Sequence, residues 1–114
     1  NFFIARDGEI FTPKPHNILR GVSRQTCMEL SAKEGIPVHQ IDIEPYDVRT
    51  ADEAWWTSTT VCMIPITRFD FQSIDDGKPG PVYPRLLNAW PAEVGVDISA
   101  QAEGYARLEK TWVP

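Results

Sequence analysis

Two short apolar runs, Phe2 to Ala5 and Glu9 to Thr12, open the chain on either side of the tripeptide R-D-G. An Asp-Gly pair between two such runs is the strongest short signal for a β-hairpin. The next patterned stretch, residues 23–34, begins at Ser23, a good N-cap residue, and stops before Gly35. These signals predict a hairpin followed by a helix.

The rest of the chain alternates between strand-like and helix-like stretches. Four hydroxyl residues, T-S-T-T at positions 57–60, separate two tryptophans from an apolar run and predict a bend between strands. The segment D-D-G-K-P-G-P has the composition of a turn. The alternation predicts a mixed α and β fold class. The expected strands are residues 38–43, 55–56 and 61–68, and the expected helical segments are residues 45–50 and 82–90.

Composition restricts the class of protein. The chain has 114 residues, which suits one globular domain with a real core. Its net charge of −5 is unsuited to a nucleic-acid surface, and no apolar run approaches the roughly 18 residues of a membrane helix. The two cysteines, Cys27 and Cys62, have neither zinc-ligand spacing nor the pattern of a disulfide framework. We therefore expect reduced thiols, no metal, no membrane or nucleic-acid partner, and a cytoplasmic location.

Two segments have the chemistry of an anion site. In L-R-G-V-S-R, Gly21 precedes Ser23 at an expected helix start, where unpaired N–H groups and the helix dipole attract phosphate or carboxylate. Gly21 would allow close approach of the backbone, and the Ser23 hydroxyl would add a donor. The T-S-T-T run offers successive N–H groups and hydroxyls at a bend.

Each of these signals also has a purely structural explanation. For Ser23 taken alone, a capping role is the favoured explanation, and Thr and Ser in β structure often bond to nearby backbone. The adjacent carboxylates Asp52 and Glu53 fit one solvated and one capping residue better than an acid and base pair. No nucleophile, base and orienting acid can be assembled from this chain.

Several stretches occur in an order that resembles the second half of the class IV aminotransferases. In chain order they are N-F-F-I-A-R-D-G-E-I-F-T-P, I-L-R-G-V-S-R-Q-T, G-I-P-V, T-A-D-E-A-W-W-T-S-T-T, P-I-T and D-G-K-P-G-P-V. This family of fold type IV pyridoxal-phosphate enzymes includes branched-chain and D-amino-acid aminotransferases and (R)-selective amine transaminases. Several motifs in the correct order are more specific than any one alone. The resemblance implies part of the C-terminal cofactor-binding domain of the D-amino-acid aminotransferase-like fold.

The resemblance also implies roles for single residues. In the family the leucine matched by Leu19 packs on the pyridine ring of pyridoxal 5′-phosphate, and T-S-T-T supplies half of a phosphate cup. Ser23 replaces a common threonine and keeps its hydroxyl, and T-S-T-T-V-C looks more like the D-amino-acid enzymes than the S-G-T-A-A-E of branched-chain enzymes. The implied cofactor-binding residues are Leu19, Gly21, Val22, Ser23, Ser58 and Thr59, and the implied substrate-binding residues are Thr60 and Val61.

Two catalytic groups of the family are absent from this chain. The Schiff-base lysine and the glutamate that pairs with the pyridine nitrogen both precede the asparagine matched by Asn1, and the chain begins there inside an apolar run. We therefore expect a C-terminal fragment, inactive alone, with residues 1–90 as a partial cofactor-binding domain and 91–114 as a tail. Its expected partners are the missing N-terminal half, amino acid and 2-oxo acid substrates, and a second copy in a homodimer.

Two other interpretations of the sequence stay open. The first is a fragment of the related aminodeoxychorismate lyase, which eliminates rather than transaminates and usually has fewer hydroxyls at T-S-T-T. The second is a stand-alone, non-catalytic phosphate-binding module, which would be monodisperse and folded at 114 residues.

Overall fold

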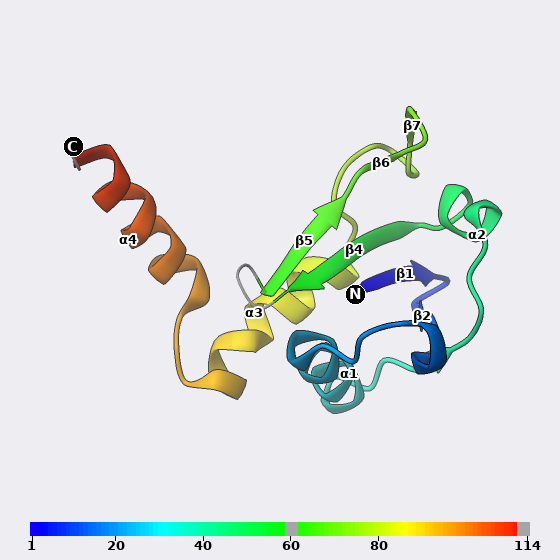
Figure 1. Cartoon of the computed structure of the whole chain (residues 1–114), viewed down its shortest axis with the longest axis horizontal. Coiled ribbons are helices and arrows are strands. Elements are labelled where there is room, and N and C mark those ends of the chain that lie inside the picture. The colour runs from blue at the N-terminus through cyan, green and yellow to red at the C-terminus, as the bar shows by residue number, and fades with distance from the viewer. Residues whose placement is uncertain (59–61, 112–114) are drawn as a thin grey trace.

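The structure is a computed structural model that describes residues 1–58 and 62–111. Five strands form its main sheet: β1 (Phe2–Arg6), β2 (Glu9–Thr12), β3 (Val38–Gln40), β4 (Glu53–Ser58) and β5 (Cys62–Ile66). Their order is β3-β2-β1-β4-β5 (Figure 1). All neighbours are antiparallel except β2 and β3, which are parallel. The fold is therefore mixed α and β, as predicted.

The helices lie on both faces of this sheet. Helices α1 (Val22–Lys33) and α3 (Val82–Val94) contact each other and β4. A 3₁₀ turn at Pro15–Asn17, the short α2 (Pro45–Arg49) and a small hairpin of β6 (Arg68–Phe69) and β7 (Gln72–Ser73) complete the body. Helix α4 (Ile98–Thr111) points away from it (Figure 1). Within the described ranges, no helix is long and apolar enough to cross a membrane.

The first hairpin forms as its sequence predicts. Ala5 pairs with Ile10 across β1 and β2, and the turn between them places Asp7 at φ 53° and Gly8 at φ 78°. Both values lie in the left-handed region that a tight hairpin turn requires. The Asp7 N–H also donates to the Asp52 carboxylate at 2.8 Å. Asp52 thus fixes the turn from outside the hairpin.

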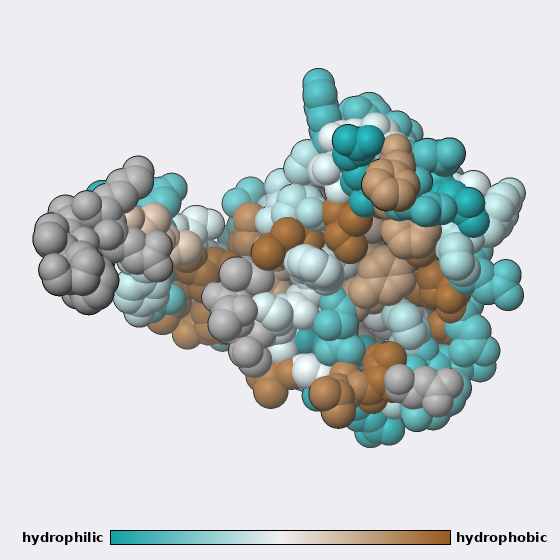
Figure 2. Space-filling model, turned by 45° about the horizontal axis from the view of Figure 1, so that its top comes forward, coloured by the Kyte–Doolittle hydropathy of each residue, from teal (hydrophilic) through white to brown (hydrophobic). Residues whose placement is uncertain are grey.

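Apolar residues alternate between the two faces of the sheet. On the face covered by α1 and α3, Phe3 of β1 stacks on Trp55 of β4 with ring centroids 5.8 Å apart. On the opposite face, Ile4 and Ala54 pack beneath Val48 of α2. Figure 2 shows that apolar surface, in brown, remains between the hydrophilic regions of the body. Apolar side chains are therefore packed on both faces of the sheet.

The start of α1 differs from the prediction. The N-cap is Gly21, and Ser23 lies inside the first turn with no side-chain cap on this end of the helix. The predicted capping role of Ser23 is wrong because the helix begins earlier, at Val22, and Ser23 is its second residue. The N-cap Gly21 has no side chain, so this end of the helix has no side-chain cap.

The ends of several other elements differ by a few residues from the predicted ones. Strand β3 ends at Gln40 rather than at residue 43, and Thr57 and Ser58 belong to β4 rather than to a bend. Helix α3 runs past Pro91 to a left-handed Gly95, so the expected division between residues 90 and 91 falls inside this helix. The sequence analysis also left α4 unpredicted, although Asp97 is a start signal for it: the Asp97 carboxylate accepts the Ala100 N–H at 3.0 Å.

Candidate functional site

The N-terminus of α1 is open to an anion. The first hydrogen bond at this end runs from the Gln25 N–H to the Gly21 carbonyl at 3.1 Å. The amides of Val22, Ser23 and Arg24 precede it and therefore have no acceptor within the helix. No acidic side chain lies in the first turn. The unpaired amides and the helix dipole thus give the N-terminal end of α1 a partial positive charge.

The end of β4 lies against this helix terminus. The Ser23 hydroxyl donates to the Ser58 carbonyl oxygen at 2.8 Å, and the Ser23 side chain is buried. The two segments chosen separately from the sequence therefore meet through one hydrogen bond. Because the Ser23 oxygen donates its proton to Ser58, it keeps its lone pairs, while its backbone N–H remains available to an anion.

Apolar side chains surround the open helix end. Leu19 is 89% exposed and Val22 is 74% exposed, which are large values for such residues. Within the described residues, the buried Thr57 hydroxyl has no hydrogen-bond partner, and it points to the α1 side of β4 because it shares the side of Trp55. A ligand with an anionic group and an apolar ring would match these unpaired polar and apolar groups.

Asn1 is a site residue that the sequence reasoning missed. Its carboxamide bonds the Leu19 carbonyl at 2.7 Å and the Gly21 N–H at 3.1 Å. The close approach at Gly21 was predicted to be to an anion, but in the structure it is made by the Asn1 side chain. Asn1 and Gly21 are 20 residues apart, so no local pattern could have found the pair.

Three of the predicted site residues cannot be placed. Thr59, Thr60 and Val61 lie outside the described residues. The roles implied for them stay predictions.

Two ionisable side chains of α1 serve packing rather than chemistry. Arg24 is buried, and its guanidinium donates to the Pro13 carbonyl at 3.3 Å and to Gln40 Oε1 at 3.0 Å. Desolvation by burial, with repulsion from Arg20, lowers the pKa of Arg24. Burial raises the pKa of the Cys27 thiol to about 12, so Cys27 is protonated at neutral pH and is a poor nucleophile.

The paired carboxylates have the structural roles expected of them. Glu53 is buried and accepts the Val82 N–H at 2.9 Å and the Tyr83 N–H at 2.8 Å, which caps α3. Asp52 holds the hairpin turn described above. In the described part of the chain, no group of three or more His, Cys, Asp and Glu side chains could hold a metal ion.

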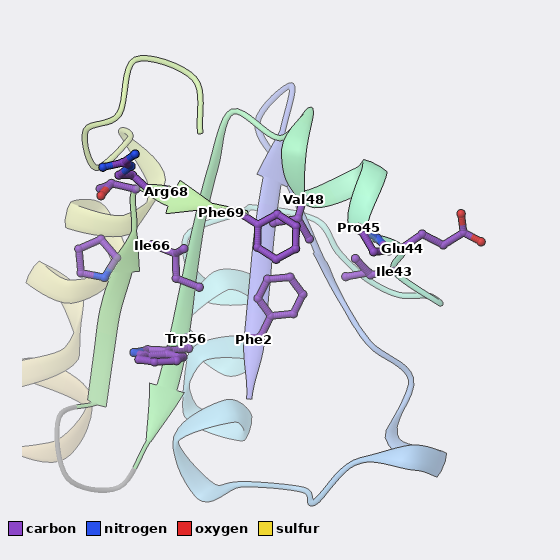
Figure 3. A pocket seen from close by; sticks show the side chains of 11 residues that line it. Phe2, Ile43, Glu44, Pro45, Val48, Trp56, Ile66, Arg68 and Phe69 are labelled. Carbon is purple, nitrogen blue, oxygen red and sulfur yellow. The ribbon is translucent and has the colours of Figure 1, made fainter. Parts of the chain in front are cut away.

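A separate cavity of about 760 Å³ lies on the opposite face of the sheet. Figure 3 shows Phe2, Trp56 and Ile66 on this face, with α1 behind the strands. Its lining is mostly apolar and its side chains come from the sheet, α2 and the β6–β7 region. The cavity is therefore distinct from the open end of α1.

The chain is therefore a mixed α and β domain in which the uncapped start of α1 lies beside the end of the interior strand β4. The chain belongs to the amino-transferase class IV family, whose sequence profile matches residues 1–69.

Individual relatives agree with this assignment. A D-alanine aminotransferase of Listeria innocua is 39% identical over 95 residues, which are 82% of this chain and 33% of that protein. The crystal structure of the branched-chain amino acid aminotransferase of Escherichia coli superposes with a TM-score of 0.76 at 28% identity, over 79% of this chain and 30% of that one. An aminotransferase of Brucella abortus bound to PLP superposes with a TM-score of 0.74 at 33% identity, over 79% and 31% of the two chains. The chain thus spans about a third of the length of its relatives.

Proposed function

We propose that this chain supplies the phosphate end of the pyridoxal 5′-phosphate site of an aminotransferase. The observation that supports the proposal most directly is the hydrogen bond from the Ser23 hydroxyl to the Ser58 carbonyl at 2.8 Å beside the uncapped start of α1. The amides of Val22 and Ser23 would hold the phosphate, and Thr59 would add a contact from the T-S-T-T run.

The residues at the site suit this cofactor. A phosphate ester on an aromatic ring matches unpaired amides and an exposed Leu19 side chain. The family membership and the PLP-bound relative from Brucella abortus support the same ligand. When bound, this cofactor supplies an electron sink for chemistry at an amino-bearing carbon. The contribution of this chain is to bind and orient the phosphate and to pack against the ring.

The proposed reaction is transfer of an amino group between an amino acid or amine and a 2-oxo acid. The names of the relatives support D-amino acids and branched-chain amino acids as substrates. Thr60 and Val61 would help to bind the substrate carboxylate. We propose that the complete enzyme is a cytoplasmic homodimer and that the 114 residues alone bind cofactor without transferring amino groups.

The test compares cofactor binding by the unaltered chain and by a Ser23→Ala/Thr59→Ala variant. Pyridoxamine 5′-phosphate is the probe, because it has no aldehyde to react with surface lysines. Loss of the Thr59 contact and of the Ser23–Ser58 hydrogen bond, which holds the start of α1 against β4, is expected to weaken binding about tenfold or more. Ser99→Ala on α4 is the matched control, because Ser99 is exposed. Equal affinity in the double variant and the unaltered chain would overturn the assigned phosphate contacts.

A further inference from the structure

Asn1 joins the segments that form the proposed phosphate site. Its Nδ2 group donates to the Leu19 carbonyl at 2.7 Å, and its Oδ1 atom accepts the Gly21 N–H at 3.1 Å. One carboxamide thereby holds both ends of the Leu19–Gly21 turn, which leads directly into α1. We infer that Asn1 is a positioning residue that fixes this turn for phosphate binding, an inference that rests on the proposed function.

The main chain of Asn1 holds the other side of the same site. Its carbonyl accepts the Thr57 N–H at 2.8 Å, and its nitrogen donates to the Thr57 carbonyl at 3.1 Å. The next residue, Ser58, accepts the Ser23 hydroxyl at 2.8 Å. The hydrogen bonds therefore form a closed ring that runs from Asn1 through the turn to α1, across to β4, and back to Asn1.

Gly21 is required by the Asn1 side chain rather than by its own backbone conformation. Its φ of −68° and ψ of 147° are accessible to any residue. A Cβ atom at this position would lie 2.5 Å from Asn1 Oδ1, whereas the next contacts are ordinary ones at 3.7 and 3.9 Å. Alanine at position 21 would consequently displace the carboxamide, and the two residues should be energetically coupled.

The chemistry of the carboxamide explains why this residue is asparagine. The turn presents one acceptor, the Leu19 carbonyl, and one donor, the Gly21 N–H. A carboxamide supplies one donor and one acceptor at the required spacing, whereas a carboxylate supplies acceptors alone. Aspartate would set an oxygen against the Leu19 carbonyl. Alanine would leave the Gly21 N–H and the Leu19 carbonyl paired only with each other, at 3.1 Å.

The turn that Asn1 holds controls two features of the site. It sets the direction of the exposed Leu19 side chain, which would contact the cofactor ring. It also sets the position of the Val22 amide at the open end of α1. Asn1 acts on the ligand through these residues. Replacing Asn1 should therefore reduce the part of the binding affinity that the phosphate group contributes.

The experiment is a double-mutant cycle on the full chain with Asn1→Ala, Gly21→Ala and the double variant. Each protein is titrated with pyridoxamine 5′-phosphate and with pyridoxamine, and its melting temperature is measured without ligand. The exposed Asn88→Ala controls for loss of a carboxamide. Gly104→Ala controls for added volume, because a Cβ there would meet only Arg107 at 3.9 Å.

We expect Asn1→Ala to reduce the preference for the phosphorylated ligand by about tenfold, on the scale of two lost hydrogen bonds. Gly21→Ala alone should weaken binding. Added to Asn1→Ala, it should weaken binding little further. If Asn1→Ala does not fold, Gly21→Ala, whose Cβ atom would displace the Asn1 carboxamide, is measured against the same expectation.

The outcomes separate this inference from the function on which it rests. If the unaltered chain binds both ligands equally, the proposed function fails. If it prefers the phosphorylated ligand and Asn1→Ala keeps that preference while lowering only the melting temperature, Asn1 is merely structural and the inference is wrong. Independent effects of the two substitutions would also overturn it.

Discussion

Ser23 combines two interactions within one residue. Its hydroxyl bonds the Ser58 carbonyl, and its amide is one of the open groups at the start of α1. The side chain and the main chain thus have separate tasks, which a substitution can separate.

Ser23→Ala should lower the free energy of unfolding by about 1 kcal/mol, because a part-buried hydrogen bond between α1 and β4 is lost. Urea denaturation of the unaltered chain and the variant measures the difference. Ser99→Ala, at an exposed position, should change it by less than about 0.5 kcal/mol. Equal stability of Ser23→Ala and the unaltered chain would show that the Ser58 contact contributes nothing.

Glu53→Gln should be more damaging. Both carboxylate oxygens accept backbone N–H groups at the start of α3, and a glutamine would turn an NH₂ group toward one of them. An unsatisfied buried donor costs about 1–3 kcal/mol, so we expect a loss of that size in urea denaturation. The exposed Glu103→Gln is the matched control. A variant as stable as the control would refute the capping role of Glu53.

At the scale of elements, α1 packs on β4 through Cys27. Burial raises the pKa of the Cys27 thiol from 9.0, its value in an unstructured chain, to about 12. The folded state therefore binds more protons than the unfolded state between these values. The stability due to this thiol is complete below pH 9.0 and is lost as the pH rises toward about 12.

Cys27→Ala should therefore flatten the decline in stability between about pH 8 and about pH 10.5. The cavity left by the thiol lowers the stability at both pH values, so the slope and not the absolute value is the readout. Urea midpoints at the two values measure it. If stability declines with pH equally steeply in the variant and the unaltered chain, the Cys27 thiol lies in a more polar environment than the structure shows.

The elements that the sequence predicted correctly depend on local signals. The Asp7 and Gly8 turn follows from two adjacent residues, and α1 and α3 follow from apolar patterns ended by glycine or turn residues. The predicted cap of α1 was wrong because the helix begins at Val22, so Ser23 lies within its first turn and its hydroxyl donates to β4, 35 residues away. Contacts of this kind depend on the tertiary fold, which local preferences do not encode.

At the scale of the whole molecule, α4 stands apart from the sheet (Figure 1). Ile98 packs partly against the core, while Tyr105 and Leu108 are exposed. A chain ending at Val96 should consequently keep its melting temperature to within about 3 °C. A loss of more than about 10 °C would mean that α4 is part of the folded body. Circular dichroism on the full-length and shortened chains decides between these results.

The site as a whole could be predicted only through the family resemblance. Chemistry alone selected Gly21, Ser23 and the T-S-T-T run as candidate anion sites, but it favoured a capping role for Ser23 and gave the T-S-T-T run an equally plain structural explanation. The structure brings Ser23 and Ser58 together, and the phosphate role of each stays a prediction. The resemblance matched Asn1 to an asparagine of the family but gave it no role, because its partners lie on a turn that only the folded chain brings near.

The most direct test is an isothermal titration of the unaltered chain with pyridoxamine 5′-phosphate and, separately, with pyridoxamine. The two ligands share the ring and differ by the phosphate, so the ratio of their affinities measures the anion site alone. We expect the phosphorylated ligand to bind at least about tenfold more tightly, and inorganic phosphate to compete with it. Equal affinity for the two ligands would mean that the open end of α1 and the end of β4 do not form a phosphate site.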